Sequence, residues 1–134
     1  LHMFLPSFAQ QGMQYLVTAL QLNHTLQVLD LHSNKIGDEG VQLLATALHV
    51  SHTLQELILV DNQVTDQGVK YLAKAIQHEK CALQKLNLSY NQIKDQGAQY
   101  LCEAIQYDHC PLQELNLYHN QITDQGVKYL TKAI

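Results

Sequence analysis

The chain has 134 residues, of which 46% are hydrophobic and 15% are charged, so it can form one domain with a buried core and is not a disordered tail. Eight basic residues, all of them lysine, against twelve acidic ones give a net charge of −4, and the basic stripe that nucleic-acid binding requires is missing. No apolar run approaches the roughly 20 residues of a membrane-spanning helix, and we therefore expect neither a nucleic-acid nor a membrane partner.

Glycines recur at a nearly constant interval along the whole chain, at Gly12, Gly40, Gly68, Gly97 and Gly126. Such a fixed period is the signature of a repeat array. Alignment on these glycines superimposes segments that read LQxLxLxxNx followed by Ile or Val. The sequence therefore predicts four complete repeats over residues 26–134, which start near residues 26, 54, 83 and 112.

The first part of the chain, residues 1–25, resembles the rear of a degenerate repeat. Alignment of Gly12 with Gly40 places Met3 over Leu31 and Pro6 at the position of the asparagine that recurs in the other repeats. Proline donates no backbone hydrogen bond and suits an edge, so this segment could be a capping repeat. Alternatively it is a truncated repeat, and residues 1–3 were in part added for expression.

Each complete repeat predicts one short strand followed by one helix. Leucine pairs such as Leu57 and Leu59 alternate with mostly polar residues, the pattern of a strand with one buried face. Apolar residues such as Val69, Leu72 and Ile76 then form a single helical stripe. The free amides at each helix start can be capped by a preceding threonine or by Asp38, Asp66, Asp95 and Asp124. A unit this short cannot bury its leucines alone, so neighbouring repeats must stack with parallel strands.

One asparagine recurs where the chain leaves each strand, at Asn34, Asn62, Asn91 and Asn120. If its side chain turns inward, the amide can hydrogen-bond to backbone groups of its own and the adjacent repeat. Because buried polar groups are nearly always partnered, we assign these four residues to the structure, as an asparagine ladder, and not to binding.

The LxxLxLxxNxI consensus, the 28/29-residue alternation, the DxG at each helix start and the Cys-x-Leu-Gln lead-in at Cys81 and Cys110 closely resemble the ribonuclease-inhibitor-like leucine-rich repeats. The resemblance covers at least residues 26–134. It implies an α/β leucine-rich-repeat solenoid, a horseshoe segment with a concave parallel β-sheet and convex α-helices, which binds macromolecular partners, usually on the concave side. It does not imply ribonuclease binding, since such repeats also serve innate-immune receptors and bacterial or protist effectors.

The outward positions of the four predicted strands, with the two positions after each strand, form the candidate binding face. This face holds four of the acidic residues and one lysine, while four other lysines lie on the predicted convex helices, which favours a basic partner surface on the concave side. The alternative is a merely solvated sheet face. The predicted partner-binding residues are Asp30, His32, Glu56, Ile58, Val60, Asp61, Lys85, Asn87, Tyr90, Glu114, Asn116, Tyr118 and His119.

Two features of this face favour protein contact. Tyr90, Tyr118 and His119 belong to neighbouring repeats and should stand side by side, and aromatic side chains make many interface hot spots. Ile58 and Val60 would be exposed β-branched hydrophobic residues in a row. The alternative is that all five are scattered surface residues of the kind that most proteins carry.

Catalytic and metal sites are not predicted. Asp30, His32 and Ser33 have the residue types of a hydrolase triad, but consecutive strand residues point apart and no elbow glycines flank the serine. His24 and His52 occupy equivalent positions and should stack, yet two ligands are too few for a stable zinc site. We therefore expect no enzymatic activity, no metal and no cofactor.

The three cysteines favour a reduced, cytoplasmic protein; the alternative, a protein secreted into a host cell as an effector, is what the family resemblance implies. Their number is odd, which does not indicate a disulfide scaffold. Cys81 and Cys110 occupy equivalent positions in adjacent repeats and should stack, so a disulfide is conceivable, but buried thiols that pack as small hydrophobic groups are the favoured interpretation. Cys102 falls on the helical stripe and should be core.

The sequence thus predicts a non-catalytic protein-protein interaction module. The alternative is a structural or autoinhibitory spacer within a longer multidomain protein, or a self-assembling repeat. The chain ends at Ile134 without a polar capping segment, and an array needs such caps for solubility, so self-association through its ends is a further expectation.

Overall fold

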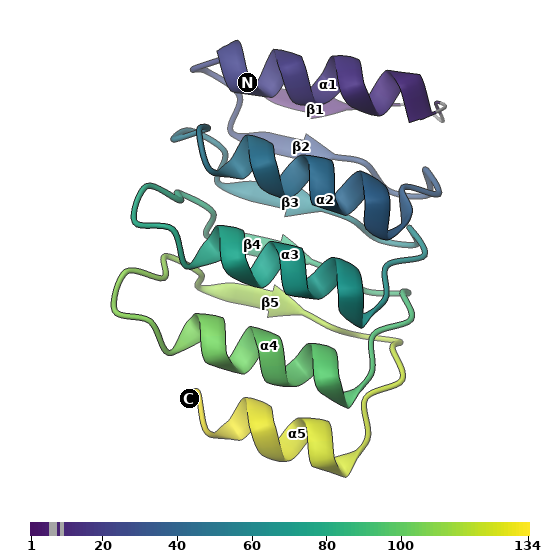
Figure 1. The fold of residues 1–134 in the computed structure, drawn as a ribbon, viewed down its shortest axis with the longest axis vertical. Helices are drawn as coiled ribbons and strands as arrows, with labels where there is room; N and C mark the ends of the chain where they lie inside the picture. The colour runs from purple at the N-terminus through teal and green to yellow at the C-terminus, as the bar shows by residue number, and fades with distance from the viewer. Residues whose placement is uncertain (6–7, 9) are drawn as a thin grey trace.

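The structure is a computed structural model that describes residues 1–5, 8 and 10–134. In this part of the chain, strands and helices alternate (Figure 1). The strands are β1 (His2–Phe4), β2 (Val28–Asp30), β3 (Glu56–Ile58), β4 (Lys85–Asn87) and β5 (Glu114–Asn116). The helices are α1 (Gln10–Leu22), α2 (Gly37–Leu48), α3 (Asp66–Ile76), α4 (Asp95–Ile105) and α5 (Asp124–Thr131). All neighbouring strands pair in parallel, in chain order.

The helices form a second layer that covers one face of the sheet (Figure 1). The predicted leucine pairs point into the space between the layers, where Leu57 and Leu59 are completely buried. Val69, Leu72 and Ile76 of α3 are likewise completely buried, so the predicted strand alternation and helical stripe meet in one core. The chain is the α/β solenoid with a concave parallel sheet and convex helices that the sequence predicts.

The alignment of the first strand was wrong by two residues. Met3 pairs with Leu29 and not with Leu31. Gly12 follows Met3 by nine positions, whereas Gly40 follows Leu29 by eleven, so the first strand-to-helix connection is shorter than the others. The glycine spacing fixes the helix register and does not fix the strand register here. The expectation for Pro6 lies outside the described residues.

The aspartates at the starts of α2, α3 and α4, Asp38, Asp66 and Asp95, cap the next helix along the array and not their own. The Oδ1 atom of Asp38 accepts hydrogen bonds from the backbone N–H groups of Thr65 (2.8 Å) and Gly68 (3.0 Å), 27 and 30 residues further on. A side chain at Gly68 would collide with this carboxylate, which explains the glycine of the DxG motif. The cap that α3 forms from its own start is weaker: the Thr65 hydroxyl oxygen accepts a hydrogen bond from the Gln67 N–H at 3.3 Å.

The asparagines of the last three repeats, Asn62, Asn91 and Asn120, bond to the repeat before them, whereas in the described residues the amide of Asn34 donates only within its own repeat. Asn62, which is completely buried, accepts hydrogen bonds at Oδ1 from the backbone N–H groups of Asn34 (3.0 Å) and Ile36 (3.2 Å). Its Nδ2 group donates to the backbone oxygens of Leu31 (2.8 Å) and Val60 (3.1 Å). These bonds hold together the turns that follow the strands, where candidate binding residues such as Asp61 and Tyr90 lie.

The last repeat is less covered than the others. Leu115 and Leu117 are half-buried, although their equivalents in the two preceding repeats are completely or almost completely buried. Val127 in α5 is 52% exposed, whereas its equivalent Val69 is 0% exposed. Apolar surface therefore lies open on the side of the last repeat that faces away from α4.

Candidate functional site

Parallel pairing arranges the predicted binding residues in columns across the concave face. Glu56, Lys85 and Glu114 pair as Cα partners, one per strand, and so do Ile58, Asn87 and Asn116. The backbone ladder continues beyond the strands, because the N–H groups of Ser33, Asp61 and Tyr90 donate to the next repeat. A further column therefore runs along the strand exits, and we call it the exit column; it consists of Ser33, Asp61, Tyr90 and His119.

The acidic charge of the face is less available than the sequence suggests. Asp30 is only 9% exposed, and its Oδ1 atom lies 2.8 Å from Nδ1 of His32. The Lys85 ammonium lies 3.3 Å from Oε1 of Glu114. Among the described residues, Lys85 and Glu114 form the ion pair of the face that needs no protonated histidine, and Glu56 and Asp61 have no cation within 4 Å.

Three predicted binding residues also stabilise the turns. The side-chain oxygens of Asp30, Asn87 and Asn116 accept hydrogen bonds from the backbone N–H two residues further on, at 3.0, 3.1 and 2.9 Å. Such Asx turns are a common use of Asp and Asn where a strand ends. Sequence reasoning missed this role, although the recurrence of Asp or Asn at three of four equivalent strand ends was a signal for it.

The exit column has an unusual backbone. Ser33, Asp61, Tyr90 and His119 all have positive φ angles, between 55° and 58°, the left-handed region that non-glycine residues seldom occupy. The turn points the side chains of Asp61, Tyr90 and His119 into solvent, and all three are exposed. The alternation of leucines predicts which face a strand residue occupies and carries no information on this turn.

The predicted aromatic residues form one cluster. The rings of Tyr90 and His119 are stacked, with centroids 4.7 Å apart and planes inclined by 10°. Tyr118 meets both rings edge-on, with centroids 5.7 Å from each. Tyr90 and Tyr118 remain 50% and 66% exposed. The predicted apolar pair is less prominent, because Ile58 and Val60 are both half-buried.

The concave face has a shallow hollow of about 230 Å³ beside the ion pair. Its lining includes Glu56, Lys85, Asn87, Glu114 and Asn116, which belong to three adjacent strands. The hollow is open and lined by both signs of charge. It therefore suits side chains of a partner better than a small molecule, which binds in enclosed and mostly apolar clefts.

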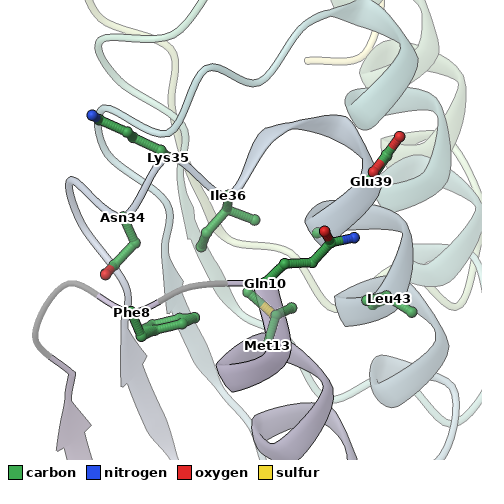
Figure 2. Close-up of a pocket in the computed structure, with 9 residues that line it drawn as sticks. Phe8, Gln10, Met13, Asn34, Lys35, Ile36, Glu39 and Leu43 are labelled. Atoms are coloured by element: carbon green, nitrogen blue, oxygen red, sulfur yellow. The ribbon is translucent and has the colours of Figure 1, made fainter.

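A second pocket of about 210 Å³ lies at the other end of the array, between the first two helices (Figure 2). It is lined by apolar groups such as Phe8 and Met13 and by the polar residues Asn34, Lys35 and Glu39. Figure 2 shows these side chains coming from separate elements without a convergent set of catalytic groups. The pocket shares no residue with the predicted binding face.

The histidines and cysteines are the residues of the chain with the chemistry to bind a metal or to form a disulfide. In the described parts of the chain, no group of three or more His, Cys, Asp or Glu side chains is placed to hold a metal ion. The stacked imidazole pair is His49 with His78, whose centroids are 4.9 Å apart. Burial raises the pKa of all three cysteine thiols, which are free in the structure.

No helix in the described residues has the length and apolar content needed to cross a membrane. The elements that carry the candidate site are all short, and each helix faces the sheet with one apolar stripe. This finding concerns the described helices only.

Stacked strand–helix units with a shared core and a solvent-facing parallel sheet define a solenoid repeat protein. The sequence model of the family described as Leucine Rich repeat matches residues 22–45, 50–73, 80–102 and 108–130. The chain therefore belongs to the leucine-rich-repeat family, whose domains are generally protein-binding modules without catalytic activity.

Solved structures with the same fold include two from other proteins. The structure of leiomodin-1 actin-binding site 2 superimposes with a TM-score of 0.78 at 16% identity, over 94% of this chain and 72% of that one. The tropomodulin C-terminal domain of Caenorhabditis elegans gives a TM-score of 0.67 at 14% identity, over 90% of each chain. Both similarities concern the fold alone. A search of the curated proteins gave no matching sequence.

Proposed function

We propose that this protein binds a protein partner through its concave face and the exit column, and that it has no catalytic role. The observation that carries this proposal is the cluster of Tyr90, Tyr118 and His119, whose rings contact one another and yet remain exposed. Aromatic groups held in a fixed arrangement bury large areas in an interface at a low cost in conformational entropy.

The charges on the face support a partner with a basic surface. Asp30 and Glu114 are paired with His32 and Lys85, whereas Glu56 and Asp61 carry negative charge without a cation within 4 Å in the described residues. Charge complementarity of this kind speeds association and selects among partners. The proposed partner therefore presents positive charge opposite β3 and its exit.

The name of one similar structure suggests a candidate partner. The leiomodin-1 structure is described as an actin-binding site, but 16% identity relates only the folds. Actin is thus one protein to include in a binding assay. The partner chemistry proposed for this chain rests on its own surface residues.

The proposal is tested by affinity capture with matched variants. Tyr90→Ser combined with Tyr118→Ser should release the proteins that the wild-type chain retains. The control combines Tyr15→Ser and Tyr107→Ser, two tyrosines that are 69% and 55% exposed and lie outside the concave face. If the control pair releases the same proteins, or neither pair does, the concave face is not the binding surface.

A second role is favoured by the open side of the last repeat. Val127 is 52% exposed and Leu115 and Leu117 are only half-buried, so another segment with the same geometry can pack there. The occupant would be a second copy of the chain, or a neighbouring part of a longer protein for which this segment is a spacer or autoinhibitory element. Sedimentation at increasing concentration tests self-association. Val127→Lys should suppress it, whereas Val127→Thr should suppress it less.

The compartment and the biological setting remain predictions from the sequence. The three cysteines are free, and burial raises the pKa of the Cys81 thiol, as we expect of a cytoplasmic protein. The effector and innate-immune roles rest on the resemblance to ribonuclease-inhibitor-like repeats alone. Fractionation of the native source decides between a cytoplasmic location and secretion.

A further inference from the structure

We infer that the exit column holds a subsite for one arginine side chain of the partner, in which the guanidinium group pairs with the Asp61 carboxylate and stacks on the Tyr90 ring. This inference rests on the proposed function and specifies its partner. The recognised group is a planar cation, and it binds at the strand exits and not in the hollow between Glu56 and Glu114.

The carboxylate of Asp61 is oriented but not neutralised. Its Oδ2 atom accepts a hydrogen bond from the Ser33 hydroxyl at 2.9 Å, which restrains the orientation of the carboxylate. Its side chain is exposed, and among the described residues no lysine or histidine nitrogen lies within 4 Å of it. The Oδ1 atom is therefore free to accept a hydrogen bond from outside the chain.

One face of the Tyr90 ring is left uncovered, and Asp61 occupies the neighbouring position of the exit column on that side. Its other face is covered by the His119 imidazole, with centroids 4.7 Å apart. Backbone bonds from Asp61 to Ser89 and from Tyr90 to Tyr118 place Asp61, Tyr90 and His119 in consecutive positions of the column. The uncovered face of Tyr90 is therefore on the side of Asp61, and Tyr118 closes the cluster edge-on at 5.7 Å.

A carboxylate beside an aromatic face is the arrangement that suits arginine best. The guanidinium group is planar, stacks on aromatic rings and donates a fork of N–H groups to a carboxylate. A lysine ammonium can use the charge but is a compact, strongly hydrated group that does not stack. A neutral planar group such as citrulline can stack but lacks the charge.

The composition of the chain excludes one occupant. All eight of its basic residues other than histidine are lysines, and it contains no arginine. A second copy of this chain therefore cannot supply the guanidinium group. An arginine in the subsite therefore comes from outside these 134 residues, which separates this contact from self-association of the repeats at the last strand and helix.

The test uses the tripeptide acetyl-Gly-Arg-Gly-amide as the probe, with the citrulline and lysine peptides as comparisons. Titration followed by NMR should give saturable shifts of the Tyr90 and His119 ring protons with the arginine peptide. We expect binding of the lysine peptide to be about three- to tenfold weaker, and no saturable shift with the citrulline peptide. Equal responses to the arginine and citrulline peptides would overturn the inference.

The variants are chosen so that the backbone survives. Asp61→Asn keeps a residue that tolerates positive φ, and Tyr90→Leu keeps an apolar side chain without a π face. Each should weaken arginine-peptide binding by about three- to tenfold. The control combines Asp108→Asn with Tyr107→Ser, an exposed acid and tyrosine outside the column, and should bind as wild type. If the control loses as much binding, or Asp61→Asn loses none, the subsite is not at Asp61 and Tyr90.

Failure of the subsite can be distinguished from failure of the proposed function. With a partner obtained by affinity capture, the subsite predicts that Asp61→Asn and one Arg→Lys change in the partner weaken the complex, and that the two effects are not additive. If Tyr118→Ser weakens the complex but Asp61→Asn and Tyr90→Leu do not, the binding face stands and the arginine subsite is wrong. If none of these variants affects the complex, the proposed function itself is wrong.

Discussion

The carboxylate of Asp95 lies on the first turn of the following helix, where it accepts hydrogen bonds from the hydroxyl and the backbone N–H of Thr123. It also accepts the N–H of Gly126 at 3.1 Å. Asp38 makes the same contacts with Thr65 and Gly68 at an earlier boundary of the array. Helix starts are thus capped across repeat boundaries. The asparagines make a second set of bonds across the same boundaries, at the strand exits. Adjacent repeats are coupled on both sides of the solenoid.

The Asp95 contact predicts a particular dependence of stability on pH. The Thr123 hydroxyl, and next the backbone N–H of Thr123, lower the pKa of the Asp95 carboxyl below its usual value. Because the folded-state pKa is depressed, the stabilisation is fully present above the unfolded pKa of about 3.9 and is lost as the pH falls through the folded pKa. Wild type should therefore exceed Asp95→Asn in unfolding midpoint at neutral pH, and the difference should shrink in acid.

The control for this prediction is Asp124→Asn. Asp124 occupies the equivalent position in α5, its side chain is exposed, and it makes no side-chain hydrogen bond within the described residues. Its replacement should change the midpoint little at any pH. A difference between wild type and Asp95→Asn that is the same at pH 7 and in strong acid would show that the carboxylate charge does not stabilise the repeat boundary.

The glycine of the DxG motif should be intolerant of alanine. A methyl group at Gly68 would collide with Oδ1 of Asp38 and lie 2.9 Å from Cγ1 of Val64. Gly68→Ala should therefore destabilise the fold by about 1–3 kcal/mol, the usual cost of overpacking, although alanine is the better helix former. Urea unfolding of Gly68→Ala, Asp38→Ala and the double variant measures the coupling. Additive effects would mean that the collision with the carboxylate is not the reason for the glycine.

The asparagine ladder should contribute to stability at each boundary that Asn62, Asn91 or Asn120 bridges. Asn91 accepts the backbone N–H groups of Asn62 and Val64 and donates to the oxygens of Leu59 and Leu88. Asn91→Ala leaves these buried groups unpaired and should cost about 1–3 kcal/mol. The neighbouring Gln92→Ala, at an exposed position, is the control. Equal denaturant midpoints for the two variants would contradict the ladder.

The repeat period predicted most of the fold. Because equivalent glycines recur at a nearly constant interval, the strands, helices and shared core of the four complete repeats could be predicted without any tertiary information. The first strand could not be placed in this way. Its connection to the helix is two residues shorter, and a loop can lose residues without a change in the helix pattern that served as the reference. Met3 accordingly pairs with Leu29.

The candidate site was predictable as a set of positions and not as a set of interactions. Alternation of leucines indicates that Lys85 and Glu114 share the outer face, and only the register reveals that they form an ion pair at 3.3 Å. The positive φ of Tyr90 belongs to the turn after β4, on which the alternation of leucines carries no information. Hydrogen bonds between distant parts of the sequence, such as those of Asp38 and Asn62, require that both partners are already placed.

The distribution of free charge gives a prediction about association kinetics. Glu114 is paired with Lys85, so its removal would free a lysine and alter two charges at once. The cleaner change is Glu56→Gln with Asp61→Asn, since both carboxylates lack a cation within 4 Å in the described residues. With a basic partner, this pair should slow association and reduce its dependence on salt, because the charges that steer encounter are removed. The dissociation rate should change less, and its change should come from loss of the direct contact between Asp61 and the partner.

The matched control removes two negative charges from elsewhere on the molecule. Glu39→Gln with Glu79→Gln changes an exposed residue of α2 and one in the loop after α3, and gives the same net charge as the first pair. Association rates measured between low and physiological salt separate the two cases, because a general charge effect slows both variants equally. If only the Glu56 and Asp61 variant associates more slowly, the charges that steer association lie on the concave face. If only the control variant associates more slowly, the basic partner approaches the helical side.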